Sequence, residues 1–384
     1  MKYLIYTIIF ISFFDLFTQL PVMSTFAESI GASSFITGIA VGLYSFSNTF
    51  GNVISGIWTD KKGPYILLPL GLATTSLSLL SYGMINDSLT LLIIRFMHGL
   101  FAGLIVPAAF AYHSSIMLKE ERGKGSAHSG AFVGIAAIVG PAFSGILASR
   151  TSVPFVFSVT AVLMLMLAII AFFSLRKFTI IRMKQNRTKD KEAGMKHDLF
   201  QNPGVIKAFT GAFFLMFAQG VIAYLLPLHV ETLGYDSKMS GILLSTFGIV
   251  AVLIFILPTN RIFDRVAPTY TLALGISLMG CSLFLLSMGT VSYILFLAMA
   301  SYGIGFGFLF PSINALLIDS TNEQVRGKAY GYFYAFFSLG VVVGSSVLGW
   351  LQLSISHGFL VTGAILILFA VVVLFNKRSQ QFSM

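Results

Sequence analysis

The sequence predicts an all-α membrane protein with twelve transmembrane helices in two pseudo-symmetric bundles of six. Its composition, its count of apolar runs and an internal repeat predict this fold. Of its 384 residues, 56% are hydrophobic and only 10% are charged, whereas soluble chains carry roughly 25% charged residues. A lipid-facing surface explains the deficit, because lipid contacts need no polar coat.

Twelve apolar runs have the length of a membrane span. A helix needs about 20 mostly apolar residues to cross a hydrocarbon core roughly 30 Å thick. The first six runs cover 4–27, 33–58, 65–85, 89–117, 125–149 and 153–175, and the last six cover 205–229, 238–262, 269–288, 291–318, 328–352 and 358–375. Asp15 interrupts the first run and no small-residue cleavage site follows it, so this run predicts a span rather than a signal peptide.

The runs divide the chain into two bundles and a linker. We expect one bundle at 1–175, a basic cytoplasmic linker at 176–204 and a second bundle at 205–384. With the N-terminus inside, 21 of the 24 Lys and Arg residues fall at cytoplasmic ends or loops. Arg150 and Lys238 lie outside, and Arg95 lies within a span. This asymmetry predicts an inner-membrane protein with both termini cytoplasmic, and it attributes the net charge of +10 to membrane topology rather than to nucleic-acid binding.

The second half repeats the first at a nearly constant offset. Glu28, Gly31 and Gly38 recur 203 residues later, as Glu231, Gly234 and Gly241. At an offset of 204, further matches are Asp60 with Asp264, Gly99 with Gly303, Gly103 with Gly307, Pro107 with Pro311, and Arg122-Gly123-Lys124 with Arg326-Gly327-Lys328. Ordered matches of this kind indicate duplication. Two halves in the same orientation predict a substrate cavity between them, near the membrane midplane.

These features resemble the major facilitator superfamily, and within it the twelve-helix drug:proton antiporters. The loop after the second span, residues 56–65, resembles the superfamily's glycine-x-x-x-aspartate-basic-x-glycine signature. Span 4 reads Arg95-Phe96-Met97-His98-Gly99, similar to an arginine-x-x-glutamine-glycine motif with His98 in place of glutamine. Span 5 carries Gly140, Pro141 and Gly145, similar to the antiporters' glycine-proline motif, and we expect a helix kink there.

Asp15, Arg95 and His98 are the candidate proton-coupling residues. A carboxylate deep in a span costs about 2.5–3.5 kcal/mol, so it is expected to face a cavity or a partner. At about 1.5 Å per residue, Asp15 and Arg95 lie at similar depth in the outer half of the bilayer. The resemblance implies that spans 1 and 4 meet at the cavity. His98 shares a helix face with Arg95 and titrates near neutral pH. The alternative is a static ion pair of Asp15 with Arg95 that fixes two helices, with His98 as a packing hydrogen bond.

The resemblance also implies a cytoplasmic gate. Asp60 would cap the positive N-terminus of span 11 near Lys328, and solvation of the loops is the simpler alternative. The candidate gate residues are Gly56, Asp60, Lys61, Gly63, Arg122, Gly123, Lys124, Asp264, Arg265, Arg326, Gly327 and Lys328.

The candidate substrate residues lie on spans 1, 7 and 10, which line the pathway in this superfamily. They are Phe14, Gln19, Gln219, Tyr224, Tyr302 and Asn314. For each of them, ordinary helix packing is the alternative. An apolar wall with few polar groups suits small amphipathic ligands.

The sequence therefore predicts a proton-coupled exporter of small amphipathic or drug-like solutes. No phosphate-binding loop of the ATPase type and no hydrolase motif is present, and we expect no enzyme activity, cofactor or metal. The expected partners are a small-molecule substrate, protons and the lipid bilayer, and the protein is expected to be a monomer. A dedicated exporter of one metabolite, such as a siderophore or a sugar, is the first alternative. An importer and a lipid flippase remain further alternatives, and a membrane receptor is the most remote.

Overall fold

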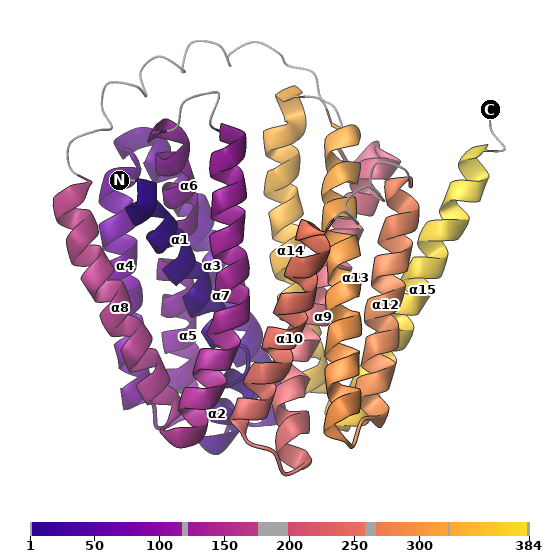
Figure 1. The fold of residues 1–384 in the computed structure, drawn as a ribbon, viewed down its shortest axis with the longest axis horizontal. Helices are drawn as coiled ribbons and strands as arrows, with labels where there is room; N and C mark the ends of the chain where they lie inside the picture. The colour runs from indigo at the N-terminus through magenta and orange to yellow at the C-terminus, as the bar shows by residue number, and fades with distance from the viewer. Residues whose placement is uncertain (1, 117–121, 176–198, 258–265, 322, 382–384) are drawn as a thin grey trace.

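The described part of the chain folds into a bundle of long helices (Figure 1). The computed structural model describes residues 2–116, 122–175, 199–257, 266–321 and 323–381. Within these ranges it describes only the backbone of residues 60, 62, 114–115, 122–127, 323–324, 326–328 and 376–381. All the regular secondary structure of this described part is helical, which confirms the predicted fold class.

The helices of the first half follow the predicted spans. They are α1 (Lys2–Thr18), α2 (Met23–Ser29), α3 (Ser34–Lys62), α4 (Pro64–Leu80), the short 3-10 helix η1 (Ser81–Met84), α5 (Ser88–Ala102), α6 (Ile105–Ile116), α7 (Arg122–Arg150) and α8 (Val153–Ser174). The first span was predicted as one run, but it consists of α1 and α2 at an angle of 48°. Pro21 lies in the break between them, where its ring and missing N–H oppose a continuous helix.

The helices of the second half correspond to the last six runs. They are the 3-10 helix η4 (Leu199–Gln201), α9 (Pro203–Thr232), α10 (Ser237–Ile256), α12 (Pro268–Met288), α13 (Ser292–Asp319), α14 (Glu323–Leu351) and α15 (Ile355–Gln381). Of the predicted linker, residues 176–198 lie outside the described part.

Ten helical segments of the described residues are long and apolar enough to cross a membrane, and the bent pair α1–α2 makes eleven. The predicted span at 33–58 corresponds to α3, which has 29 residues but is not one of the ten. Ser45, Asn48 and Asn52 are among the polar residues that lower its hydropathy.

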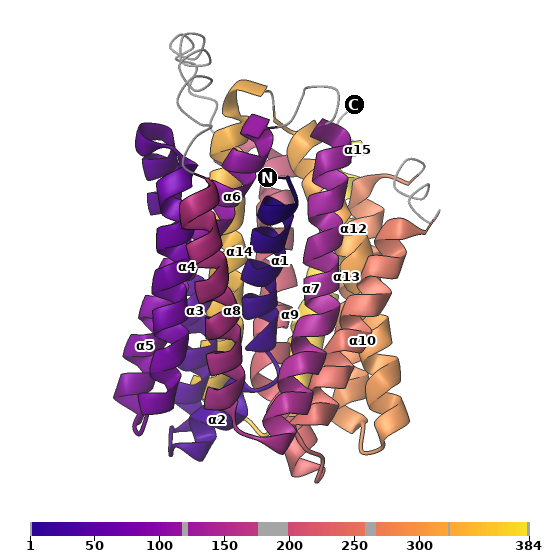
Figure 2. The same cartoon turned by 60° about the vertical axis from the view of Figure 1, so that its left-hand side comes forward.

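The two bundles lie side by side (Figures 1 and 2). In the first bundle α4 packs on α8, α3 on α5 and α1 on α7, and in the second α12 packs on α13 and α15, and α9 on α14. The start of α1 and the end of α15 lie at one end of the molecule, and α2 lies at the opposite end (Figure 1). We call this opposite end the α2 end.

The same turn occurs at equivalent places in the two halves. Gly31 and Gly234 have φ of +81° and +83°, a conformation that glycine adopts without steric cost. Their N–H groups donate to the carbonyls of Glu28 and Glu231, both at 2.9 Å. This helix-ending turn is the geometry expected for a glycine just after a helix, and its recurrence supports the duplication.

The halves are joined through close helix contacts near the α2 end. On α3, a Cβ at Gly38 would overlap the carbonyl of Ser345 on α14. On α7, a Cβ at Gly145 would overlap the backbone of α10 at Ser237 and Gly241. Small residues permit helices to approach this closely in a membrane. Gly56 and Gly331, nearer the other end of α3 and α14, have open space where a Cβ would be.

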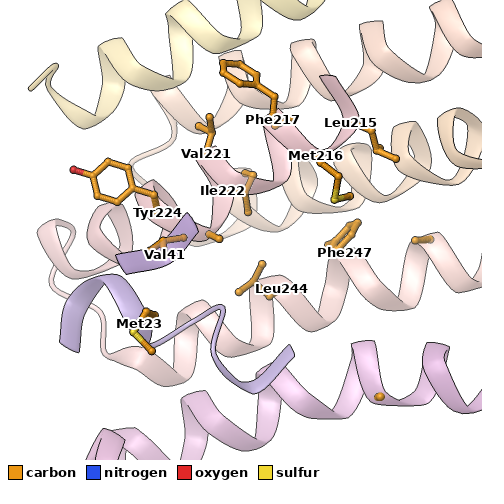
Figure 3. Close-up of a cluster of buried hydrophobic side chains, with 14 of the residues drawn as sticks. Met23, Val41, Leu215, Met216, Phe217, Val221, Ile222, Tyr224, Leu244 and Phe247 are labelled. Atoms are coloured by element: carbon orange, nitrogen blue, oxygen red, sulfur yellow. The ribbon is translucent and has the colours of Figure 1, made fainter. Parts of the chain in front are cut away.

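An apolar cluster also bridges the two halves near this junction (Figure 3). Met23 on α2 and Val41 on α3 lie with Ile222 on α9 and Leu244 on α10, and each of the four is at most 7% exposed. The hydroxyl of Tyr224 on α9 donates to the carbonyl of Ser34 at 3.3 Å. The broken first span is therefore part of the closed junction at the α2 end.

Candidate functional site

The structure brings Asp15, Arg95 and His98 into one buried network between α1, α3, α5 and η1. Their side chains are 0%, 2% and 0% exposed. Asp15 is in the last turn of α1, before the break in the first span. Arg95 and His98 are three residues apart on α5, a spacing that places both on the face toward α1 and α3.

His98 is the nearest hydrogen-bond partner of the Asp15 carboxylate. Its Nε2 lies 3.1 Å from Oδ2 of the carboxylate. The hydroxyl of Tyr44, on α3, donates to the same oxygen at 3.5 Å, and Nε2 of Gln19 donates to Oδ1 at 3.4 Å. A buried carboxylate is costly unless it is paired and hydrogen-bonded, and these three donors supply that compensation.

Arg95 reaches Asp15 through two bridges. A guanidinium can only donate hydrogen bonds, and NH1 of Arg95 donates both to Oε1 of Gln19 and, at 3.4 Å, to the hydroxyl oxygen of Tyr82. Gln19 then donates to Asp15. The remaining donors of Arg95 bind carbonyls of α3, with Nε at 2.7 Å from Ala40 and NH2 at 3.2 Å from Val41.

The second bridge assigns the proton on His98. The hydroxyl oxygen of Tyr82 accepts from Arg95, so its proton is free to point at Nδ1 of His98, 3.2 Å away. Nε2 is then the protonated nitrogen and donates to Asp15. A series of hydrogen bonds therefore runs from Arg95 through Tyr82 and His98 to Asp15. A proton on the carboxyl group of Asp15 would oppose the hydrogen bond that it accepts from Nε2 of His98.

The break in the first span is bonded directly to this network. The carbonyl of Asp15 accepts hydrogen bonds from the hydroxyl of Thr18 at 2.8 Å and from Nε2 of Gln19 at 3.0 Å. The carbonyl of Gln19 accepts from the N–H of Val22 and from that of Met23, the first residue of α2. A rearrangement of Gln19 would therefore act both on Asp15 and on the hinge that carries α2.

The predicted substrate residues do not form one group. Gln19 lies in the network and is 3% exposed, and Phe14 packs on α7 with its ring 5.1 Å from that of Phe143. Tyr224 lies at the junction of the halves. The other three lie in the second half: the hydroxyl of Tyr302 donates to Oε1 of Gln219 at 3.4 Å, and Oδ1 of Asn314 accepts from Tyr330 at 3.4 Å.

An aromatic cluster surrounds Tyr302. The ring of Phe247, on α10, lies 5.3 Å from those of both Tyr302 and Phe306, and Phe306 stacks on Phe310 at 6.0 Å. Phe306 and Phe310 are only partly buried. We call Phe247, Tyr302, Phe306 and Phe310 the aromatic wall.

The predicted kink residues lie within one continuous helix, α7. Gly140 allows α1 to approach, because a Cβ there would lie 2.9 Å from that of Phe17, and Gly145 contacts α10. Pro141 has no N–H to donate to the carbonyl of Ala137, and that carbonyl faces Gly248 of α10. Thus all three residues lie where α7 packs on α1 or α10.

Most of the predicted gate lies outside the described side chains. Asp264 and Arg265 are outside the described residues. The side chains, or for glycine the surroundings, of Asp60, Arg122, Gly123, Lys124, Arg326, Gly327 and Lys328 are also outside them. Gly63 connects α3 to α4 with φ of +84°, Lys61 is exposed, and Gly56 borders open space. The gate remains a prediction.

The sequence reasoning did not find Tyr44 and Tyr82. Both are enclosed aromatic residues that bond to the network, and neither interrupts an apolar run as a charge does. The role of Gln19 was also missed, although its position four residues after Asp15 on one helix face could have indicated the contact.

Comparison with known proteins gives a consistent result. The sequence profile of the Major Facilitator Superfamily matches residues 5–257 and again residues 208–381. The chain is 25% identical to multidrug resistance protein 2 of Bacillus subtilis over 94% of this chain and 90% of that protein. It is 26% identical to multidrug resistance protein MdtG of Salmonella typhimurium over 93% and 88%.

Solved structures share the fold at lower identity. A bacterial homologue of the human lysosomal transporter Spinster, in an inward-facing and occupied conformation, superposes with a TM-score of 0.80 at 12% identity and covers 98% of this chain and 96% of its own. The nucleoside transporter NupG gives a TM-score of 0.78 at 14% identity over 97% and 98% of the two chains.

Proposed function

The chain belongs to the Major Facilitator Superfamily, and from this premise we propose that it is a proton-coupled antiporter that exports small amphipathic solutes. It is a multi-pass membrane transporter of a small-molecule substrate and not an enzyme. One observation carries the proton coupling: a fully buried carboxyl group, Asp15, is paired with a histidine beside the break in the first span.

Protonation of Asp15 would change the bonds that hold this break. The ionised carboxylate accepts from His98, Tyr44 and Gln19. A proton on Asp15 removes the negative charge of the carboxylate, which these donors stabilise. It also occupies one of the two oxygens that accept their hydrogen bonds. Because Gln19 also bonds to Arg95 and to the end of α1, its release would loosen the hinge before α2.

The hinge connects the proton site to the junction of the two halves. α2 packs against α9 of the second half, and Met23 contributes to the apolar cluster shared with α9 and α10. A change in the angle between α1 and α2 would disturb that junction. We infer that this is how the proton biases the equilibrium between a state closed at the α2 end and a state open there.

The orientation of the molecule follows from the Lys and Arg distribution and belongs to the same proposal. With both termini cytoplasmic, the α2 end faces outward and the structure is closed to the outside. The basic linker at 176–204 then lies in the cytoplasm, and Asp60 with the paired Arg-Gly-Lys segments, Arg122–Lys124 and Arg326–Lys328, forms the gate that closes the opposite end.

The aromatic wall supports an amphipathic substrate. Two of its rings, Phe306 and Phe310, are partly exposed and offer apolar contact area, and Gln219 and Asn314 add polar groups that are neutral and partly exposed. Apolar walls with a few polar groups bind ligands that are mainly apolar. The names of the relatives in Bacillus subtilis and Salmonella typhimurium point to drug-like solutes.

The test is transport in liposomes that contain the purified chain, with an imposed pH gradient and the membrane potential set to zero. The probes are ethidium as an amphipathic cation, a neutral dye, an anionic dye, glucose and a ferric siderophore. We expect amphipathic probes to cause proton flux, and we expect Asp15→Asn to abolish this flux while probe-for-probe exchange persists. Undiminished pH-driven accumulation by Asp15→Asn would contradict the proposal, and flux with glucose or the siderophore alone would indicate a dedicated exporter.

A further inference from the structure

The Asp15–His98 pair has a counterpart in the second half. At an offset of 204 residues His98 corresponds to Tyr302, and Gln219 lies directly after Ala218, the residue that corresponds to Asp15 at the offset of 203 found for Glu28, Gly31 and Gly38. The adjacent glycines, Gly99 and Gly303, support this alignment. A Cβ on Gly99 would contact the carbonyl of Tyr44 on α3, and one on Gly303 would contact the carbonyl of Phe247 on α10, the equivalent helix.

The counterpart keeps the hydrogen bond and loses the charge. The hydroxyl of Tyr302 donates to Oε1 of Gln219 at 3.4 Å, and Nε2 of His98 lies 3.1 Å from Oδ2 of Asp15. Each bond joins the first span of its half to the fourth span. An amide does not titrate, and a phenol ordinarily titrates only near pH 10. The second pair can therefore hold two helices together without exchanging a proton at physiological pH.

The rest of the network has apolar counterparts. Arg95 corresponds to Met299 and Tyr82 to Leu286 at the offset of 204, and Gln19 corresponds to Ile222 at the offset of 203. All three of these apolar residues are 0% exposed. At the equivalent place, the second half therefore has no guanidinium and no counterpart of the bridging residues Gln19 and Tyr82. Duplication has been followed by divergence, and only the first half keeps ionisable partners at this site.

Asp15 is the one acid in the interior of a predicted span, whereas Glu28, Glu231 and Asp319 lie in the last turns of α2, α9 and α13 and are exposed. Of the 14 Asp and Glu residues in the sequence, only Asp15 lies inside one of the twelve predicted runs. Two span histidines bond to neutral groups: His113 to the hydroxyl of Tyr6 at 3.2 Å, and His229 to the carbonyl of Gly289 at 3.1 Å.

We propose that the transporter moves one proton per cycle, bound by the Asp15–His98 pair of the first half, while the neutral Gln219–Tyr302 bond of the second half exchanges no proton. This proposal rests on the proposed function. The groups that face Asp15 are His98 and Arg95 from α5, Tyr44 from α3, and Gln19. A second proton would add another positive charge beside Arg95 in a site that water does not reach, which is costly.

The first experiment uses the full chain without any solute. Infrared difference spectra between pH 5 and pH 9 are recorded in deuterated buffer, and carboxyl bands that exchange slowly report buried acids. We expect one such band, and we expect Asp15→Asn to remove it while Gln219→Leu leaves it in place. A second slow, pH-dependent carboxyl band that survives in Asp15→Asn would overturn the proposal.

The second experiment measures the stoichiometry of the unmodified chain in liposomes with ethidium as the probe. At zero membrane potential, a tenfold ethidium gradient is set against a range of pH gradients, and the pH difference at which net flux stops is found. One proton per ethidium requires a difference of one pH unit, and two protons require half a unit. A value of half a unit would overturn the single-proton proposal and leave the antiport itself intact, whereas coupling that persists in Asp15→Asn would refute the assignment of the transported proton to Asp15 in the proposed function.

Discussion

Nε2 of His98 lies 3.1 Å from Oδ2 of Asp15, and neither side chain has any exposed surface. The pair joins α5 to the last turn of α1, directly before the break in the first span. The geometry gives Arg95 an indirect role at this pair. Arg95 is bonded to α3 carbonyls and to the two bridging residues, so it acts on the carboxyl group through Tyr82, His98 and Gln19.

Replacement of His98 by leucine is expected to move the pH dependence of coupled transport upward, because leucine cannot donate to Asp15. A hydrogen bond to a charged group contributes about 1.5–3 kcal/mol, and its loss favours the protonated form of Asp15. That energy corresponds to a shift of about one to two pH units in the midpoint of coupled transport. Proton flux in liposomes, measured from pH 5 to pH 9, checks it. His357→Leu, on the exposed start of α15, is the matched control, and an unchanged midpoint in His98→Leu would argue against proton binding by the Asp15–His98 pair.

Replacement of Gln19 by alanine is expected to uncouple proton movement from solute movement. The variant loses one of the two bridges between Arg95 and Asp15 and the side-chain bond to the end of α1. We expect solute-independent proton leak to rise several-fold while solute exchange persists. Thr25→Ala, in α2 of the same span, is the control because the hydroxyl of Thr25 donates locally, to the carbonyl of Val22 at 3.2 Å. Equal proton leak in the two variants would show that Gln19 contributes to helix packing and not to proton coupling.

The sequence predicts the fold well because lipid imposes a simple rule on every span. Length, hydropathy and the placement of Lys and Arg are local properties, and they identify the helices of both halves. The break in the first span was missed, although Pro21 was a local signal for it. Whether a proline ends a helix or only bends it depends on packing, here that of α2 on α9.

The site could be predicted only in part. Asp15, Arg95 and His98 stand out because charge is rare in spans, and the structure brings all three together. Which of them touch could not be predicted, because that depends on side-chain directions across α1, α3 and α5. Tyr82 and Tyr44 gave no signal, since a tyrosine in a span is ordinary until its hydroxyl is seen to lie 3.2 Å from a histidine or 3.5 Å from a carboxylate.

Asp87 is expected to stabilise the fold at neutral pH and to lose this effect in acid. It caps α5, and hydrogen bonds from the hydroxyl and N–H of Thr90 hold its pKa below the ordinary value of 3.8. The lowered pKa means that the effect is complete above that value and disappears as the pH falls below it. The Tm of Asp87→Ala should be about 2 °C below that of the unmodified chain at pH 7, and the gap should close below about pH 4. Asp236→Ala is the control, because Asp236 precedes α10 without a capping hydrogen bond.

Replacement of Gly38 by alanine is expected to open the junction at the α2 end. The new Cβ would overlap the carbonyl of Ser345 on α14, and overpacking of this kind costs about 1–3 kcal/mol. That cost falls on the closed state alone, so it shifts the population toward the state open at this end by about 5- to 150-fold. Labelling of Met23→Cys in a Cys281→Ala background checks the shift, because Met23 is 2% exposed within the junction. Gly331→Ala, on α14, is the control since its Cβ enters open space in this state, and equal labelling rates in the two alanine variants would show that the α3–α14 contact does not hold the junction closed.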